Sequence, residues 1–595
     1  MAAEIEEPVV AGDSSATAEE VKPYRIHVSS RYLNLTKQKL EIARLPHEFD
    51  EPKSKDWWQP KSQVEPLIDF WLEQYQWRDH EEILNRLPQF RTGFAIPQSD
   101  SPIRIQFIHV RSSHANVIPL LLIPPFPFSS LSVGHLVKLF TDPEEVNHQP
   151  FHLVIPSLPG LGFSDALPTN SPVISSTADL LDSLMKRLDY SHYLVTNAGA
   201  GVLSPAQIDY KLADWLATQY PDSCLGTHLI SPPLTRPRAR QAPLGWAKWS
   251  IARFFEGSVL GYRTEDYSAL RKSGGAVAPS KKSTITLSAA LGFGFSGTGL
   301  TEPNTLSYAL CDSPTGLLVF AMKGLRLLAP KKEFSPTEII NFTQLAWLPG
   351  PEAALRFWAH CARHPENSEN SGSGKKKSAR KPRVALTVFL GDEKGGDSSS
   401  NSGNAEIVFD NGMKPPYSCP AWAGARYDVL YTHRAAGDAG LLAWECPELI
   451  AAGVRGLAAA VLRVDRRLQP EGRPETARAA AVAETSAAPA TATSPEVQEQ
   501  KQQQQQQQQQ PPSPPGLSSE QQPPLGLGLL APPKIGERLL PVREISEDTK
   551  VASSDSLAAA KTPSPMPATP SPVHSGPPQP ATVAVGGVLN GGRRG

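Results

Sequence analysis

Short apolar runs alternate with segments of helical spacing through most of the first 435 residues, and this alternation constrains the fold more than any other feature. Between the runs, residues 177–188 and 210–220 repeat apolar side chains at helical spacing. Continuous apolar strands that alternate with helices indicate a mostly parallel sheet with helices on both faces. The sequence therefore predicts an α/β fold with strands at 104–110, 118–123, 151–156, 192–196, 227–231, 384–389 and 427–432.

Composition changes at both ends of this region. Residues 1–22 are acidic and polar, and residues 466–595 contain the glutamine run 502–510 and proline-rich repeats such as TPSPMPATPSPV. Such segments cannot bury enough apolar surface to offset the entropy lost on ordering. We expect a disordered leader over 1–22, a disordered Gln/Pro-rich tail over 466–595, and mobile loops near 364–382 and 392–405.

Charge and cysteine usage exclude several classes of protein. The chain has 58 basic and 59 acidic residues, a net charge of -1, so no global field attracts nucleic acid. Its five cysteines form no CxxC pair, which predicts reduced thiols and no metal site. It shows no signal peptide and no run of about 18 apolar residues, so we expect no membrane span and a soluble, cytoplasmic protein.

The stretch TNAGAGVL, residues 196–203, follows one predicted strand and precedes a predicted helix. Small residues gather where the strand is expected to turn sharply into the helix. Turns of this kind serve to present a nucleophile. Here the exposed position holds a residue with no reactive side chain.

Several ordered phrases resemble the microsomal-type epoxide hydrolases. They are YRIHVSSRYLNLTKQKLEIARLP, DFWLEQYQWRDHEEILNRLPQFRT, PSLPGLGFSD and TLSYALCDSPTGLL, within residues 24–462. The resemblance implies an α/β-hydrolase fold with an N-terminal segment over 23–110, a core over 111–465 and a helical lid over 232–361. It also implies covalent epoxide opening by an elbow aspartate, two lid tyrosines that bind the developing alkoxide, a histidine base oriented by an acid, and no cofactor or metal.

The positions that carry this chemistry in the family are substituted here. The nucleophile position falls on Gly199, and a register shifted by two residues would place Asn197 there. The base position, counted back from Pro447, falls on Gly440, while Asp392 matches the acid. The sequence therefore predicts a turn without a nucleophile and an acid without a histidine to orient.

The oxyanion loop and the lid also depart from the family pattern. Proline has no N–H to donate, so a loop of prolines cannot present donors well. The lid tyrosine positions fall on phenylalanine or tryptophan, which keep a ring and lose the hydroxyl. Tyr308 is expected to pack in the lid core. The substituted positions are Pro124, Pro125, Phe126 and Pro127 in the loop and Phe295, Phe357 and Trp358 in the lid.

The combined losses favour an epoxide hydrolase-like protein without the activity, because removing one member of a nucleophile–base unit already costs about 10⁴ to 10⁶ in rate. Such a protein would keep an apolar pocket for a small ligand, slightly enlarged at Gly199. One alternative is an active hydrolase rebuilt from Asn197 or Thr196 with Asp392 and His433. Another is an interaction protein whose partners bind its low-complexity tail.

Overall fold

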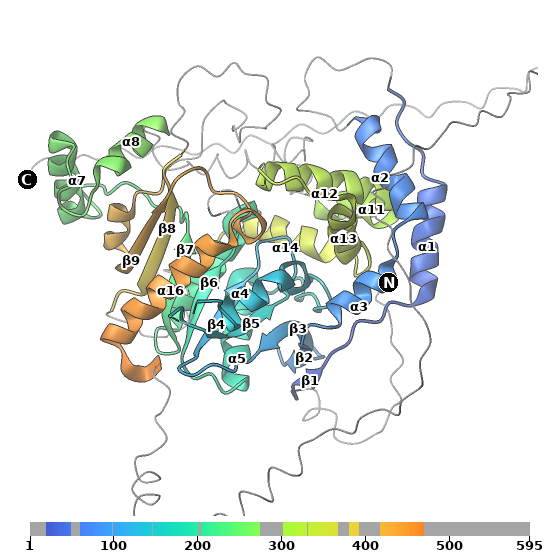
Figure 1. Ribbon diagram of the computed structural model, residues 1–595, viewed down its shortest axis with the longest axis horizontal. Helices are drawn as coiled ribbons and strands as arrows, with labels where there is room; N and C mark the ends of the chain where they lie inside the picture. Colours follow the sequence, from blue (N-terminus) through green and yellow to red (C-terminus); the bar gives the residue numbers. More distant parts are fainter. Residues whose placement is uncertain are drawn as a thin grey trace, which may run out of the picture. The chain divides into compact units, whose positions relative to one another are not determined.

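Nine strands form one sheet in the computed structural model of the chain (Figure 1). The sheet order is β1-β2-β3-β5-β4-β6-β7-β8-β9, and every pair from β5 to β9 is parallel. The first three strands join antiparallel. This topology confirms the predicted α/β class with a mostly parallel sheet. The strands are β1 (Lys22–Pro23), β2 (Gln89–Phe94), β3 (Ile103–Val110), β4 (Ile118–Ile123), β5 (Phe151–Pro156), β6 (Tyr193–Asn197), β7 (Cys224–Ile230), β8 (Arg383–Phe389) and β9 (Asp428–Ala435).

The structure describes residues 19–48, 60–97, 99–145, 147–199, 201, 204–273, 302–329, 331–366, 380–391 and 417–468. The described chain begins at residue 19, before the expected start at Pro23, and the Glu19 carbonyl accepts a hydrogen bond from Thr92. It also continues past the expected end at Asp465, since Leu468 is buried. The loop 392–405 and the glutamine run lie outside the described residues. No helix in these ranges is long and apolar enough to cross a membrane.

Strand β4 shows why the sheet is covered on both faces. Leu121 and Ile123 join the core beneath helices α5 and α6, whereas Leu120 and Leu122 join the core beneath α4 and α16. Alternate side chains of a strand point to opposite faces, so an unbroken apolar run needs two helical layers. The layers are α5 (Val173–Arg187) and α6 (Ile208–Gln219) on one face, and α4 (Val137–Thr141), α15 (Leu442–Glu445) and α16 (Pro447–Val464) on the other.

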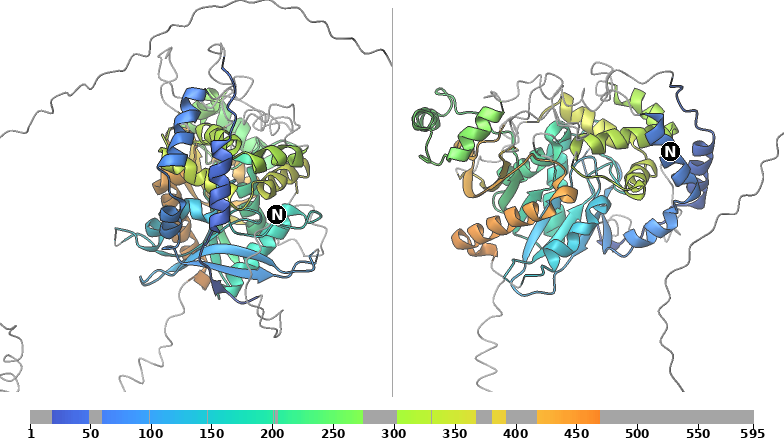
Figure 2. Two further views of the ribbon diagram at one scale, coloured as in Figure 1. Left: turned by 90° about the vertical axis from the view of Figure 1, so that its right-hand side faces the viewer. Right: turned by 45° about the horizontal axis from the view of Figure 1, so that its top comes forward.

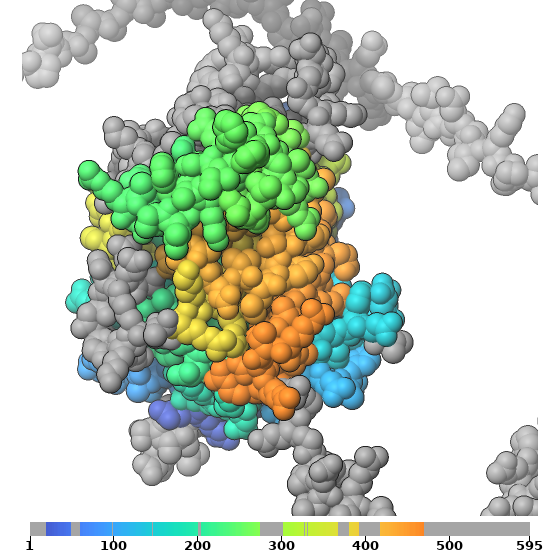
Figure 3. All heavy atoms as spheres, turned by 90° about the vertical axis from the view of Figure 1, so that its left-hand side faces the viewer, coloured from blue at the N-terminus to red at the C-terminus, as the bar shows by residue number. Residues whose placement is uncertain are grey.

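The described helices of the predicted lid fall into two groups. Helices α7 (Pro243–Phe255) and α8 (Thr264–Lys272) pack beside β8 and the turn before β9. Helices α11 (Pro303–Asp312), α12 (Pro314–Leu328), α13 (Pro336–Trp347) and α14 (Glu352–Arg363) form a separate group that extends from the middle strands toward the N-terminal helices (Figures 1 and 2). Figure 3 shows α7 and α8, in green, standing at the margin of one face above the orange residues of β9 and α16.

The N-terminal segment is part of both the sheet and the lid layer. Its strands β1 to β3 extend the sheet, so the expected boundary at residue 110 runs through one continuous sheet. Its helices contact the lid helices, α1 against α12 and α2 against α13. Figure 2 shows the blue N-terminal helices beside the yellow-green lid helices. These helices are α1 (Ser30–Glu41), α2 (Lys61–Glu73) and α3 (Trp77–Leu84).

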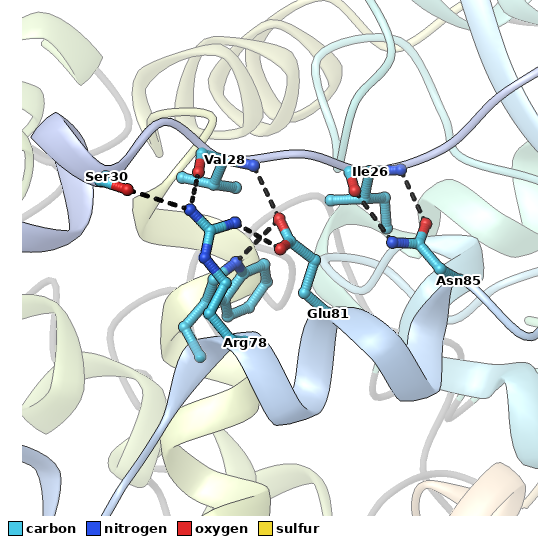
Figure 4. Close-up of polar contacts among 7 residues, drawn as sticks. Ile26, Val28, Ser30, Arg78, Glu81 and Asn85 are labelled. Carbon is cyan, nitrogen blue, oxygen red and sulfur yellow. Dashed lines mark hydrogen bonds and ion pairs between the residues drawn. The ribbon is translucent and has the colours of Figure 1, made fainter.

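The WRDHEEILN phrase, in and just after α3, holds the extended segment 26–28 in place (Figure 4). Buried Glu81 accepts the Val28 N–H at 2.7 Å and pairs with Arg78, whose guanidinium also donates to the Val28 carbonyl. Asn85 exchanges two hydrogen bonds with the backbone of Ile26, at 2.8 and 2.9 Å. Extended backbone outside a sheet must find such partners, because an unpaired buried polar group is costly. These side chains therefore substitute for a neighbouring strand.

Glu81→Ala is expected to lower the free energy of unfolding by about 2–3 kcal/mol, since it leaves the Val28 N–H without its acceptor and Arg78 without its carboxylate. Urea denaturation measures the change. Glu82→Ala is the matched control, because its pair with Arg86 is on the surface and should contribute about 0.5 kcal/mol or less. Equal effects of the two variants would contradict the assigned role of Glu81.

Candidate functional site

The loop after β4 brings predicted oxyanion and lid positions together. Phe126 is buried and stacks on Phe357 of α14, with ring centroids 5.9 Å apart and an interplanar angle of 22°. Its ring also lies edge-on to Trp358, 6.3 Å away. Aromatic side chains therefore fill the junction between the core and the lid, where the family resemblance implies polar groups.

The same loop offers few backbone donors. Pro124, Pro125 and Pro127 have no N–H. The Phe128 N–H donates to the Pro125 carbonyl at 2.8 Å and is used within the turn. A loop arranged in this way forms an apolar wall and is poorly suited to stabilise a developing oxyanion.

A buried polar network fixes the base of this loop. The side-chain oxygen Oε1 of Gln106 accepts from the Ser157 hydroxyl at 2.6 Å and from the Ser130 hydroxyl at 3.1 Å. Its side-chain Nε2 donates to Gln89 Oε1 at 3.1 Å. Gln106 is fully buried, so each of these bonds replaces a lost contact with water. The network ties the loop to β2, β3 and β5 and holds it in one position.

An apolar cavity of about 130 Å³ lies between the loop and the lid helices. Only two of its lining residues, Ser129 and Ser132, carry a hydroxyl, and none carries a charge. The walls come from four parts of the chain, and the principal side chains are Phe126 and Phe128 of the loop, Leu161 after β5, Leu317, Phe320 and Leu328 of α12, Phe342 and Leu345 of α13, and Leu355 and Trp358 of α14.

Gly199 lies directly against the carboxylate of Asp209, from the second residue of α6. A Cβ built on Gly199 would lie 1.7 Å from Asp209 Oδ2. Both residues are fully buried. The space that a side chain at the nucleophile position would need is therefore occupied by a carboxylate supplied from elsewhere in the chain.

One expectation about the elbow is corrected here. Gly199 does not line the cavity, so a glycine at this position does not enlarge it. Strand β6 ends at Asn197 and α6 begins at Ile208, and residues 200, 202 and 203 between them lie outside the described residues, so the sharp turn stays a prediction. Just before α6, Ala206 and Gln207 adopt positive φ values of 48° and 55°.

Asn197 uses both ends of its amide inside the core. Its Nδ2 donates to Asp209 Oδ2 at 3.1 Å, and its Oδ1 accepts the Ile230 N–H at 3.1 Å. It thereby joins β6 to both α6 and β7. A buried amide with both functions satisfied is typical of a structural residue.

Gly440 repeats the pattern seen at Gly199. A Cβ on Gly440 would lie 1.8 Å from Glu445 Oε2, so a histidine would not fit there without moving Glu445. Glu445 accepts the Lys331 N–H at 2.9 Å and thus links α15 to the segment after α12. Burial raises the pKa of Glu445, and hydrogen bonds from the backbone of Lys331 and Lys332 oppose that rise.

Buried His228 makes its hydrogen bonds within the sheet, and neither Asp209 nor Glu445 is among its partners. It lies between Thr196, 2.9 Å away, and Thr387, 2.8 Å away, and burial lowers its pKa to about 3. A histidine that stays neutral between two hydroxyls serves β6, β7 and β8 as a core hydrogen-bonding group. His433 lies inside β9 and not at a strand end. Thr196, Asn197 and His433 are all absent from the cavity lining.

The comparisons with known proteins show similarity to epoxide hydrolases. The family described as epoxide hydrolase N terminus matches residues 21–133. A Stigmatella aurantiaca protein provisionally named an epoxide hydrolase is 28% identical over 386 residues, which cover 62% of this chain and 74% of that protein. Epoxide hydrolase 1 of Sus scrofa is 24% identical over 385 residues, which cover 61% of this chain and 75% of that protein.

A solved structure extends the similarity to the whole core. The crystal structure of juvenile hormone epoxide hydrolase from Bombyx mori superposes with a TM-score of 0.55 at 19% identity, covering 75% of this chain and 96% of that chain. The chain is similar to the epoxide hydrolases. Residues 21–133 match their N-terminal family, and the core has the α/β-hydrolase fold of the solved structures.

Two of the epoxide hydrolase positions predicted from sequence, Asp392 and Phe295, lie outside the described residues. Tyr308 does not pack in the lid core, because its side chain is 83% exposed on α11. Among the residues that the structure describes, no cluster of three or more His, Cys, Asp or Glu side chains could hold a metal ion.

Asp209 and Glu445 are the residues of this site that the sequence did not reveal. Asp209 follows Gly199 by ten positions, and only the structure shows that its carboxylate lies against Gly199. Glu445 is five positions beyond Gly440, within a region where acidic residues are common. The sequence indicated only that a glycine stands at each of the two predicted catalytic positions. It could not indicate which side chain occupies the space beside that glycine.

Asp209→Asn is expected to change how stability depends on pH. Burial raises the pKa of Asp209, and hydrogen bonds from Ser204 and Asn197 oppose that rise. The folded protein therefore holds this proton more tightly than the unfolded chain, and stability falls as pH rises from the ordinary pKa through the raised one. Asparagine does not titrate, so the stability of the variant relative to the parent should increase between about pH 4 and pH 7. Urea denaturation across this pH range measures it, and a constant difference would show that Asp209 has an ordinary pKa.

Proposed function

We propose that this protein is an epoxide hydrolase relative without epoxide hydrolase activity, and that it binds a small apolar molecule in the cavity between core and lid. The observation that carries the proposal is the carboxylate of Asp209 packed against Gly199. This carboxylate is fully buried, and the cavity lining does not include it. A nucleophile must reach the substrate carbon, so this arrangement supports binding without covalent catalysis.

The substituted base and lid positions support the same proposal. Glu445 fills the space at Gly440, and the Phe357 and Trp358 rings pack on Phe126 where tyrosine hydroxyls would bind an alkoxide. A rebuilt hydrolase would need a nucleophile, a base and an acid converging on one reacting atom. The described lining of the cavity contains two serines and otherwise apolar residues or glycine.

The size of the cavity sets the ligand class. A dry cavity of roughly 150 Å³ lined by aliphatic and aromatic side chains admits benzene. The cavity here is about 130 Å³ and similarly lined, so it suits a molecule with one aromatic ring or a short branched chain. Two-ring compounds such as stilbene oxide should be excluded.

The test combines a hydrolysis assay with a binding measurement on the full chain. With styrene oxide, we expect no diol above the buffer rate, no ester adduct by intact mass, and saturable quenching of tryptophan fluorescence from Trp358 in the cavity wall. With stilbene oxide, we expect neither turnover nor quenching. Diol formation above the buffer rate would overturn the non-catalytic proposal, and an ester adduct located on Asn197 would identify a nucleophile at the shifted register. Absence of quenching by styrene oxide would overturn the ligand proposal.

Gly324→Phe is expected to weaken styrene oxide binding at least tenfold, about 1.4 kcal/mol. Gly324 lines the cavity from α12, and a Cβ there meets nothing within 4 Å, so a ring can occupy the ligand volume without distorting the helix. Replacing a helical glycine should also raise helix stability slightly. Gly324→Ala is the graded control and should keep binding. If both variants bind styrene oxide like the parent, the ligand occupies another site.

A further inference from the structure

Helix α7 carries a second apolar stripe on the side that faces away from the protein. Trp249 and Ala252 pack against the core, with Trp249 beside Tyr262 and Trp422. Leu244, Ile251 and Phe254 repeat at intervals of seven and three residues and are 79%, 49% and 83% exposed. Residues with this spacing share one face of a helix. The helix is therefore apolar on both its inner and its outer face.

Further large side chains continue the outer surface. Trp246 is 43% exposed, Phe255 is 65% exposed, and Leu260 follows the helix with 48% exposed. Most of the large hydrophobic side chains that are exposed in the described chain come from residues 244–260. An exposed apolar patch concentrated in one segment is typical of an interaction site.

Basic residues outnumber acidic ones in residues 236–260, where Glu256 is the single acidic residue and pairs with Arg271 of α8. Residues 236–255 read RPRARQAPLGWAKWSIARFF, with five basic residues and no acidic one. These basic side chains are exposed, with Lys248 and Arg253 on the helix itself. The chain as a whole has a net charge of -1, so this concentration of positive charge is local.

We propose that residues 236–260 dock on the surface of an anionic lipid bilayer. The outer stripe would enter the boundary between headgroups and acyl chains, as exposed Trp, Phe and Leu side chains of interfacial helices do. The arginines and Lys248 would contact lipid phosphates, each adding electrostatic attraction to a negatively charged leaflet. Figure 3 shows the green atoms of α7 and α8 at the surface of the face turned to the viewer.

Charge favours a lipid surface over a second copy of the chain. In a two-fold dimer the same patch faces itself, so the five basic residues of one segment would approach those of the other. An anionic bilayer neutralises these charges and accepts the apolar stripe at the same time. Trp249 and Ala252 on the inner face of α7 are buried against α8 and the turn before β9. Lipid can therefore cover the outer stripe without breaking these contacts or unfolding the core.

The experiment is vesicle co-sedimentation of the full chain with phosphatidylcholine alone and with phosphatidylcholine mixed with phosphatidylserine. We expect binding to the mixed vesicles about tenfold or more tighter than to neutral ones, and weaker in high salt. The double variant Phe254→Ser/Phe255→Ser should lose most of this binding. Tyr308→Ser is the matched control, since Tyr308 is as exposed as Phe254 but lies on α11, and it should bind like the parent.

Size-exclusion chromatography without vesicles completes the test. A parent protein that is dimeric and fails to bind vesicles, with a monomeric Phe254→Ser/Phe255→Ser variant, would overturn the proposal and assign the stripe to a second copy. Vesicle binding that is equal for the parent and this variant would also overturn it. Loss of binding in Lys248→Glu/Arg253→Glu, with an unchanged elution volume and circular dichroism spectrum, would support it.

Discussion

Gly199→Asp, which restores the residue type of the family nucleophile, is expected to lower the free energy of unfolding by about 3–5 kcal/mol and to restore no hydrolysis. The new side chain would begin 1.7 Å from Asp209 Oδ2 in a site closed to water. Atoms cannot share that space, and two carboxylates side by side in the core cannot both remain charged. The chain must shift locally, and the displaced groups lose their hydrogen bonds.

The double variant Gly199→Asp/Asp209→Ala should recover much of the lost free energy of unfolding. Removing the Asp209 carboxylate leaves space for the new carboxylate at residue 199. Equilibrium denaturation of the parent, both single variants and the double variant gives the coupling between the two sites. Gly424→Asp is the control, since a Cβ at Gly424 meets nothing within 4 Å and the variant should change stability by about 0.5 kcal/mol or less. If Gly199→Asp is as stable as Gly424→Asp, Asp209 does not occupy the nucleophile position.

The second large effect is expected at Asp266, whose replacement by alanine should cost about 3–5 kcal/mol. Asp266 is fully buried at the start of α8 and accepts two hydrogen bonds from Arg434 of β9, at 2.8 and 3.0 Å. It also accepts from the Tyr417 hydroxyl at 2.6 Å and from the Arg263 N–H at 2.9 Å. Removing the carboxylate leaves a guanidinium that is 7% exposed without its counter-charge. The expected result is detachment of α7 and α8 from the sheet as well as lower global stability.

Thermal denaturation and limited proteolysis of Asp266→Ala measure these two consequences. The matched control is Glu256→Ala, since Glu256 pairs with Arg271 between the same two helices but both side chains are more than half exposed. Such a surface pair contributes about 0–1 kcal/mol. The double variant Asp266→Leu/Arg434→Met should recover stability, because apolar replacement of both partners removes the unpaired charge. A double variant as unstable as Asp266→Ala would contradict this account of the pair.

The sheet was predictable because its strands are continuous apolar runs. Residues 118–123 and 151–156 were expected as strands with the bounds that β4 and β5 have, since a strand buried on both faces leaves a pattern that needs no tertiary information. Strand β2 was missed. Its sequence, QFRTGF, mixes polar and apolar residues because it lies near the sheet edge between β1 and β3. The antiparallel edge of the sheet therefore leaves a weaker signal than its parallel centre.

From the sequence, the candidate site could be predicted only as a list of positions at which this chain departs from the epoxide hydrolase pattern. Phe126, Phe357 and Trp358 were each predicted as substituted family positions, but the contact among their rings appears only in the structure. The carboxylates beside Gly199 and Gly440 did not follow, since they depend on where α6 and α15 begin. The prediction for Tyr308 was wrong because an aromatic residue in a helix was assumed to face inward, and the outer side of α11 is exposed.

The bracing of α12 and α13 by the N-terminal helices has a consequence for selectivity. Trp347 of α13 donates to Thr36 of α1 at 2.9 Å, and Tyr75, just beyond α2, donates to Asn341 of α13 at 2.8 Å. The cavity therefore has the aromatic loop on one side and, on the other, lid helices that the N-terminal segment holds from outside. Walls held in this way cannot easily move apart to fit a larger molecule, so the N-terminal segment would help to set which ligands the cavity accepts.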